Sequence, residues 1–172
     1  MPRPPIRLAL PDEYDAVGHL LVRSYAAIPG MPVSEGLIAE LCDVRARAED
    51  CVVLAAIDGG DVVGTVTYVP SNVVAAAEFD DPDGAGIRML AVDPVFRGKG
   101  LGRALTEECL RHARAAGRTT VYLHTTQWME AAGRMYETMG FERRRDLDWT
   151  PEPGIKLLGY RYELTRRQNA NA

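Results

Sequence analysis

Cysteine is scarce in this chain, and its three copies form no metal-binding or disulfide pattern. Cys42, Cys51 and Cys109 are odd in number and widely separated. This arrangement argues against a disulfide framework and against a zinc-binding spacing. We therefore expect no metal, reduced thiols that serve as small apolar fillers, and a cytoplasmic location.

Neither a strong net charge nor a long apolar run is present. The 20 basic and 24 acidic side chains give a net charge of −4, so nothing global indicates a nucleic-acid partner or an anionic membrane. No apolar run approaches the length of a transmembrane helix, and the opening MPRPPIRL lacks the apolar core of a signal peptide. The length of 172 residues predicts one domain, with an ordered core at about 6–164 and a disordered polar tail at 166–172.

The stretch from Ile87 to Gly117 organises the rest of the chain. Its apolar run ends at Asp93-Pro94, because proline has no N–H for a sheet and disfavours helix at its predecessor. Three glycines then alternate with other residues, and from Leu101 onward apolar positions recur one helical turn apart until Gly117. The pattern predicts a strand, a tight glycine turn and a helix.

The turn at residues 97–103 has the features of an anion-binding site. Unpaired N–H groups and the helix dipole place partial positive charge at a helix start, and glycine lets a ligand approach the backbone. Arg97, Lys99 and Arg103 add mobile positive charge, so we expect a phosphate ligand. The alternative is a glycine turn that only lets the helix pack tightly on its strand. The spacing fits neither a Walker loop nor a dinucleotide-binding fingerprint.

Two motifs, in this order, resemble the GNAT superfamily of acyl-CoA-dependent N-acyltransferases. The first is R-x-x-G-x-G at Arg97, Gly100 and Gly102, and the second is WMEAAGRMYETMGF at residues 128–141. In that family the turn holds the pyrophosphate of coenzyme A, and the preceding strand splays at a bulge and pairs with the pantetheine arm. The resemblance implies an acetyl-CoA site made by Leu90, Ala91, Val92, Arg97, Gly98, Lys99, Gly100, Leu101, Gly102 and Arg103.

The resemblance covers the chain from about Ile6 to Leu164 and implies an α/β (α+β) fold. We expect a mixed, mostly antiparallel twisted sheet of about seven strands flanked by about four helices. The strands at 87–92 and 119–125 would pair in parallel through a right-handed crossover. The other strands are predicted at 5–10, 51–57, 62–69, 141–149 and 157–164, and the helices at 11–27, 34–48, 101–117 and 129–139.

Tyr136 is the candidate proton donor to the leaving thiolate. In the resembled helix this tyrosine points its hydroxyl at the sulfur of the coenzyme. Spacing alone favours a different interpretation, a core aromatic beside Ala132 and Met139. The donor to the developing oxyanion is expected to be a backbone N–H near Ala91 or Val92.

No motif identifies the general base. Many members of the family carry a glutamate just before the central strand, where this chain has Gly86. Glu78 is our candidate, acting through a water or by attracting a cationic acceptor, and a solvated acidic loop is the alternative. His124 is a second candidate, with a hydrogen-bonded structural histidine as its alternative. Asp80, Asp81 and Asp83 of the same loop are alternative candidates for the role of Glu78.

Together these features predict an N-acetyltransferase that moves an acetyl group from acetyl-CoA directly to a primary amine of a small molecule or peptide. No metal, nucleic acid or membrane is expected as a partner, and the resemblance implies self-association as a homodimer. A non-catalytic acyl-CoA-binding sensor or interaction module is the first alternative, because Gly86 and Trp128-Met129 depart from the family pattern. An acyltransferase for another acyl group or for a hydroxyl acceptor is the second.

Overall fold

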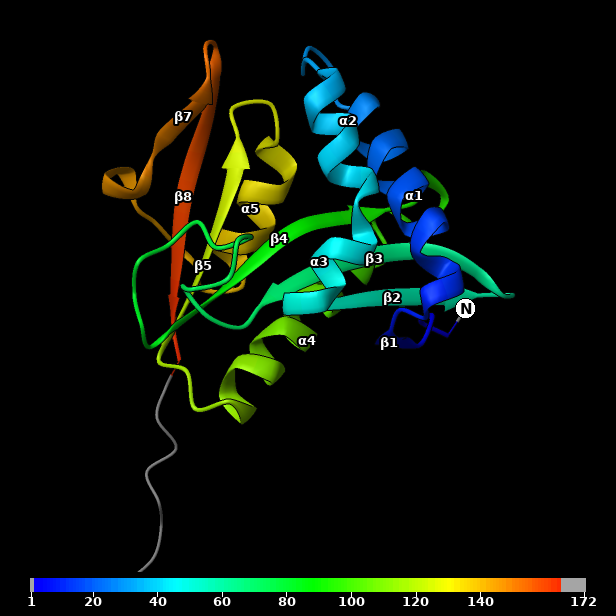
Figure 1. Cartoon of the computed structure of the whole chain (residues 1–172), viewed down its shortest axis with the longest axis horizontal. Coiled ribbons are helices and arrows are strands. Elements are labelled where there is room, and N and C mark those ends of the chain that lie inside the picture. The colour runs from blue at the N-terminus through cyan, green and yellow to red at the C-terminus, as the bar shows by residue number, and fades with distance from the viewer. Residues whose placement is uncertain (1, 165–172) are drawn as a thin grey trace, which may run out of the picture.

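The computed structural model describes residues 2–164, which form one twisted sheet with helices on both faces (Figure 1). The strands are β1 (Ile6–Leu8), β2 (Val52–Asp58), β3 (Asp61–Val69), β4 (Gly84–Val92), β5 (Thr120–Thr126), β6 (Glu142–Arg143), β7 (Trp149–Glu152) and β8 (Ile155–Glu163). The α-helices are α1 (Tyr14–Ala26), α2 (Glu35–Cys42), α3 (Val44–Asp50), α4 (Leu101–Ala115) and α5 (Glu130–Thr138). Short 3-10 helices lie at η1 (Pro11–Glu13), η2 (Pro94–Phe96) and η3 (Arg145–Leu147).

The order of the strands confirms the mixed, mostly antiparallel sheet. The order is β1-β2-β3-β4-β5-β8-β6, and β7 pairs with β8 outside this path. Among the strands of residues 2–164, only β4 and β5 run parallel, and α4 provides the crossover between them. Parallel neighbours need such a crossover, whereas antiparallel neighbours can be joined by short turns such as the one between β2 and β3.

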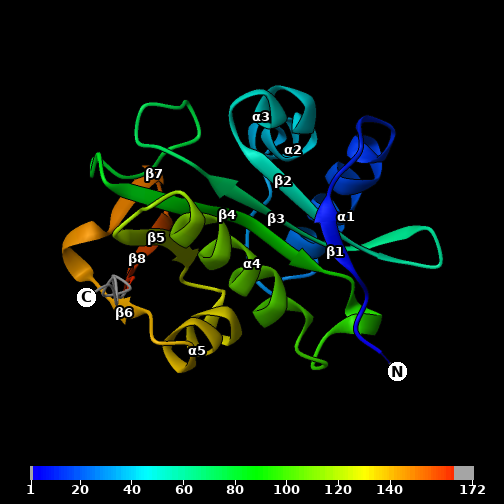
Figure 2. The same cartoon turned by 90° about the horizontal axis from the view of Figure 1, so that it is seen from below.

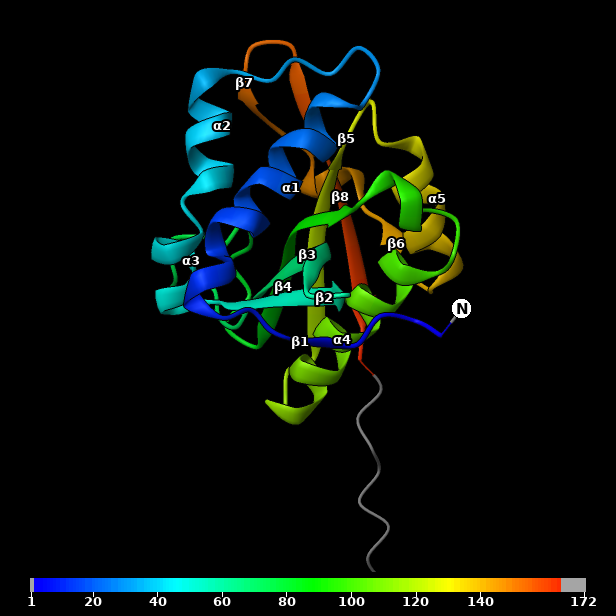
Figure 3. The ribbon, with the colours of Figure 1, turned by 90° about the vertical axis from the view of Figure 1, so that its right-hand side faces the viewer.

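The alternation of side chains along β2 divides the core into two layers. Val53 and Ala55 pack in one cluster with residues of α1, α2 and α3. Leu54 and Ala56 point to the opposite face and pack in a second cluster with residues of α4 and α5. Figures 2 and 3 show the corresponding arrangement, with α1, α2 and α3 on one side of the sheet and α5 on the other.

The centre of the sheet opens where β4 leaves β5. The two strands pair only from Gly84 to Ile87 on β4, and beyond this point their arrows diverge (Figure 1). The pairing of β3 with β4 shifts by one residue at the same place, and Met89 takes a left-handed φ of 55°. An extra residue in one strand bends it and strengthens its twist. The splayed, bulged strand implied by the resemblance is therefore present.

The sheet has eight strands and the described chain five α-helices, rather than about seven and about four. The predicted helix at 34–48 divides at Asp43, whose ψ of 56° is not helical and whose carboxylate accepts the N–H of Ala46 to begin α3. The predicted strand at 141–149 divides because Asp148 accepts the backbone N–H of Gly159 and draws the chain into a turn at η3 before β7. The predicted disordered tail lies outside the described residues.

Two findings apply to residues 2–164. None of their helices is both long and apolar enough to cross a membrane. No group of three or more histidine, cysteine, aspartate or glutamate side chains among them is placed to hold a metal ion.

Candidate active site

The glycine turn brings the start of α4 close to the end of β4. Gly98 and Gly100 have φ angles of 73° and 78°, in the left-handed region that side chains disfavour. Gly100 is the N-cap residue of α4 and contributes no side-chain hydrogen bond to the first turn. The first N–H groups of this 15-residue helix are therefore available to an external anion.

A cavity of about 630 Å³, which we call the turn cavity, lies beside this turn. Arg97 is fixed at its edge, because its Nε donates to the carbonyl oxygen of Val92 at 3.2 Å. Of the ten residues predicted to hold the cofactor, Lys99 does not line the cavity, and its ammonium lies over the ring of Phe96. The other nine do: Leu90, Ala91, Val92, Arg97, Gly98, Gly100, Leu101, Gly102 and Arg103.

A second cavity of about 590 Å³, which we call the splay cavity, lies where β4 and β5 separate. Its walls come from α1, α2, the loop between β3 and β4, β4 itself, β5 and the β7–β8 hairpin. Tyr25 and Met129 line both cavities, so the two adjoin at these side chains. Burial raises the pKa of Tyr25 to about 12, and its phenol therefore stays protonated at neutral pH.

Glu78 is held by Arg88 and His124 in the wall of the splay cavity. Its Oε1 lies 3.0 Å from Nη2 of Arg88, and its Oε2 lies 3.3 Å from Nδ1 of His124. Burial alone would raise the pKa of Glu78, but the hydrogen bond from His124 and the charge of Arg88 outweigh burial and lower it. Glu78 is therefore ionised at neutral pH, although its side chain is only 18% exposed.

His124 bridges Glu78 to the turn before β7. Its Nε2 lies 2.9 Å from the carbonyl oxygen of Leu147. A carbonyl and an ionised carboxylate both only accept hydrogen bonds, so both contacts are hydrogen bonds when Nε2 and Nδ1 each carry a hydrogen. The sequence left open whether His124 is structural or catalytic, and its position combines a structural anchor with contact to the candidate base.

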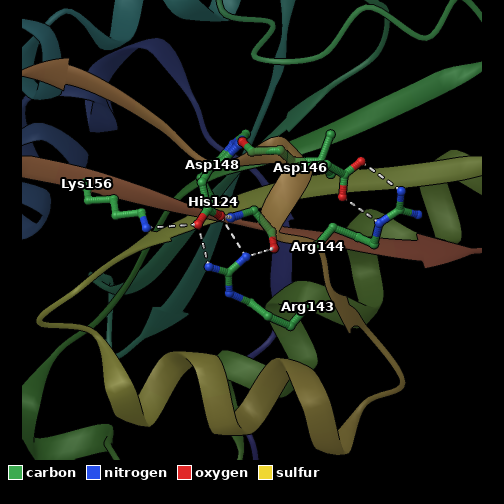
Figure 4. Close-up of polar contacts among 8 residues, drawn as sticks. His124, Arg143, Arg144, Asp146, Asp148 and Lys156 are labelled. Atoms are coloured by element: carbon green, nitrogen blue, oxygen red, sulfur yellow. Dashed lines mark hydrogen bonds and ion pairs between the residues drawn. The ribbon is translucent and has the colours of Figure 1, made fainter.

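The carbonyl that orients His124 is itself fixed by Asp148, the next residue along the chain. Arg143 and Lys156 converge on the carboxylate of Asp148, at 2.7 Å and 3.4 Å (Figure 4). These contacts, with the hydrogen bond from Arg143 as the largest cause, lower the pKa of Asp148 to about 2. The ion pairs of Asp148 thus stabilise the turn at η3 and with it the position of Leu147.

Many members of the resembled family have a glutamate at the position of Gly86. In this chain the ring of Phe79 fills the space that a side chain at position 86 would need. A Cβ added at Gly86 would lie 2.8 Å from Cε1 of Phe79. The ring also stacks on Tyr122 with centroids 5.3 Å apart, and the phenol of Tyr122 donates to Asp81 at 2.9 Å. The missing side chain thus makes room for the loop residue that follows Glu78. The other acids of the loop, Asp80, Asp81 and Asp83, line neither cavity.

Tyr136 lies in the core beside the turn cavity. The residue is 4% exposed, and its ring packs edge-on against Phe141, with centroids 5.4 Å apart. Burial raises the pKa of its phenol, so the group is protonated at neutral pH. Tyr136 is not among the residues that line either cavity, although Ala132 and Met135 of the same helix line the turn cavity. Its role as an acid stays a prediction.

Sequence reasoning did not identify Tyr25, Met129 or Glu40 as members of the site. Tyr25 lies on α1, and no local pattern in the sequence indicated that it would lie between two cavities. Arg88 did give a signal, because it interrupts an otherwise apolar strand. A charge at such a position requires a partner, and Glu40 and Glu78 are its partners.

Comparison with known proteins identifies relatives of this chain. Residues 15–141 match the model of the family described as "Acetyltransferase (GNAT) family". A mycothiol acetyltransferase of Nocardiopsis dassonvillei is 40% identical over 84 residues, which are 49% of this chain and 25% of that protein. The human N-acetylaspartate synthetase is 33% identical over 107 residues, which are 62% of this chain and 32% of that protein. The matches thus span a quarter to a third of these relatives.

Solved structures share the fold over nearly the whole chain. A GNAT-family acetyltransferase from Staphylococcus aureus superposes with a TM-score of 0.77 at 14% identity and covers 94% of this chain and 99% of its own. The structure of yncA from Salmonella typhimurium, solved with acetyl-CoA, has a TM-score of 0.68 at 20% identity, and the match covers 99% of both chains. At these identities the likeness establishes the fold.

Proposed function

The chain belongs to the GNAT acetyltransferase family, and on this premise we propose that it transfers an acetyl group from acetyl-CoA directly to a primary amine of a small molecule or peptide. One observation carries the proposal: two cavities of similar size adjoin at Tyr25 and Met129, where β4 leaves β5. The turn cavity offers an anion site at its far end, and the splay cavity offers an ionised carboxylate. A thioester and an amine could meet at the junction.

The turn cavity fits the coenzyme chemically. The open N–H groups after Gly100 and the guanidinium groups of Arg97 and Arg103 suit a diphosphate. Among residues 2–164, no strand pairs with the β5-facing edge of residues 88–92. These backbone groups are therefore available to pair with an amide-containing arm and to donate an N–H to the thioester oxygen.

Glu78 is the proposed base. The amine nitrogen attacks the carbonyl carbon, so that a C–N bond forms as the C–S bond breaks. Bond formation makes the nitrogen strongly acidic, and a carboxylate with a lowered pKa is then basic enough to take its proton. His124 and Arg88 keep Glu78 ionised and fixed in direction. The released thiolate takes a proton from Tyr136, or from Tyr25, which lies at the junction itself.

The test is thiol release from acetyl-CoA with a panel of primary amines, comparing the wild type with Glu78→Gln. We expect kcat/KM to fall by about 10²-fold or more in Glu78→Gln, with little change in acetyl-CoA affinity by calorimetry. Asp80→Asn is the matched control, because it removes a carboxylate from the same loop outside both cavities. Equal kcat/KM in Glu78→Gln and the wild type would remove Glu78 from the mechanism.

The same assay decides between catalysis and binding alone. Two relatives are named mycothiol acetyltransferase and N-acetylaspartate synthetase. The panel therefore includes aspartate as well as amines without a carboxylate. Tight acetyl-CoA binding without thiol release across the panel would favour a non-catalytic acyl-CoA-binding protein.

A further inference from the structure

The splay cavity has one arginine and no lysine among the described residues that line it. The two carboxylates nearest to this residue, Arg88, both contact the same nitrogen of its guanidinium group. Its Nη2 lies 3.0 Å from Oε1 of Glu40 and 3.0 Å from Oε1 of Glu78, and its Nη1 faces the carbonyl oxygen of Ala76 at 3.5 Å. Its side chain is 21% exposed. The charge of Arg88 is therefore already matched within the protein.

The remaining charges of the cavity are mainly negative. Glu40, Glu78 and Glu152 line it, against Arg88 and His124. Glu152 has no ion-pair partner among residues 2–164, and Glu40 is 49% exposed beside Arg88. Even with His124 counted as a cation, carboxylates outnumber positive groups. A carboxylate brought into the cavity would meet like charge in a partly desolvated site, where repulsion is stronger than in water.

The rest of the lining carries no charge and is mainly apolar, apart from the hydroxyl groups of Tyr25, Ser34 and Thr126. Met31 and Leu37 come from the α1–α2 side, and Leu157 comes from β8. Trp149, which is 44% exposed, lies on β7 in the same wall. These side chains offer contact area to a hydrocarbon or aromatic body and no further cation.

We propose that the acceptor is a primary amine with an apolar body and no carboxylate next to the amine, as in an aralkylamine or the terminal amine of a peptide. This inference rests on the proposed function and specifies its acceptor. Arg88 acts as the positioning residue that holds Glu78, and its pairing with Glu40 prevents it from serving as a receptor for an acceptor carboxylate.

The pairing makes a prediction with a definite sign. Glu40→Gln removes one of the two charges that match Arg88, at a partly exposed position where little stability is lost. Part of the charge of Arg88 then becomes available to a ligand. Glu40→Gln should therefore improve the use of a carboxylate-bearing amine relative to its neutral counterpart. A merely structural role for Glu40 would not change this ratio.

The experiment compares phenylalanine with phenylalaninamide, in which a neutral carboxamide replaces the carboxylate. The measured quantity is kcat/KM for thiol release from acetyl-CoA, corrected for the neutral fraction of each amine. The wild type is expected to prefer phenylalaninamide by about tenfold or more. Glu40→Gln is expected to reduce this preference about fivefold, and Glu35→Gln, on the same helix but outside the cavity, to leave it unchanged.

Two results would overturn the inference while leaving the proposed function intact. They are a wild type that uses phenylalanine as well as phenylalaninamide, and a Glu40→Gln variant with an unchanged ratio. No thiol release with any amine would instead contradict the proposed function, and this inference with it.

Discussion

Gly86→Ala tests how the loop delivers Glu78 to the site. The added Cβ would lie 2.8 Å from Cε1 of Phe79, whereas ordinary contact begins at 3.4 Å, so the ring must withdraw by more than half an ångström. The added Cβ would also lie 3.3 Å from Cβ of Val69, which limits how far residue 86 itself can shift. Overpacking of this kind in a core costs about 1–3 kcal/mol. We expect this loss in the free energy of unfolding, measured with denaturant.

The displacement should also reach the chemistry. Glu78 precedes Phe79 in the chain, and its contacts with Arg88 and His124 are 3.0 Å and 3.3 Å long. Misplacing a reacting group by a fraction of an ångström to one ångström can lower the rate by about 10-fold to 10²-fold. We therefore expect kcat/KM to fall about tenfold or more in Gly86→Ala. Acetyl-CoA affinity should be unchanged, because Gly86 does not line the turn cavity.

A double-mutant cycle isolates the contact. Phe79→Ala removes the ring that the new methyl group would meet, so Gly86→Ala should cost about 1–2 kcal/mol less in that background than alone. Gly36→Ala is the control for a glycine-to-alanine change, because its Cβ would meet nothing closer than 3.9 Å. In helix α2 this control should be neutral or stabilising. If Gly86→Ala loses no more stability than Gly36→Ala and keeps the kcat/KM of the wild type, the account of the loop is wrong.

Three further predictions concern the turn cavity, the acid and the η3 turn. Gly100→Ala and Gly117→Ala share a left-handed φ, 78° and 70°, and should each cost about 1–2 kcal/mol of stability, but only Gly100→Ala should weaken acetyl-CoA binding by calorimetry. Tyr136→Phe should lower turnover with acetyl-CoA binding nearly intact. If Tyr136→Phe leaves turnover unchanged and Tyr25→Phe lowers it, the proton donor is Tyr25. Asp148→Asn should cost about 2 kcal/mol at neutral pH. Because the folded pKa of Asp148 is lowered from 3.8 to about 2, this difference in unfolding free energy should persist above about pH 4 and vanish as the pH falls through 2; a constant difference would contradict the ion-pair explanation.

The parts of the site that could be predicted from the sequence are local. Glycine is favoured at Gly98 and Gly100 because their φ angles are left-handed, and α4 begins within one residue of the turn. Nine of ten predicted cofactor residues line one cavity because they lie within 14 positions of one another, from Leu90 to Arg103. Local backbone chemistry and helical periodicity suffice for such a segment.

The acceptor side could not be predicted because it is assembled from distant segments. Glu40, Arg88 and His124 come from α2, β4 and β5, and they meet Glu78 only through the tertiary fold. The division of the predicted helix at Asp43 has a different and local origin, because the carboxylate of Asp43 accepts the N–H of Ala46 and begins a new helix there. Glu78 was selected from four acids of one loop, and only its contacts distinguish it from the others.

The most direct test of the central claim is a crystal structure of the protein with acetyl-CoA. Our account predicts the diphosphate at the backbone N–H groups that follow Gly100 in the turn cavity, and the acetyl group at the junction between Tyr25 and Met129, open towards the splay cavity. Acetyl-CoA bound elsewhere, or an acetyl group separated from the splay cavity, would contradict it.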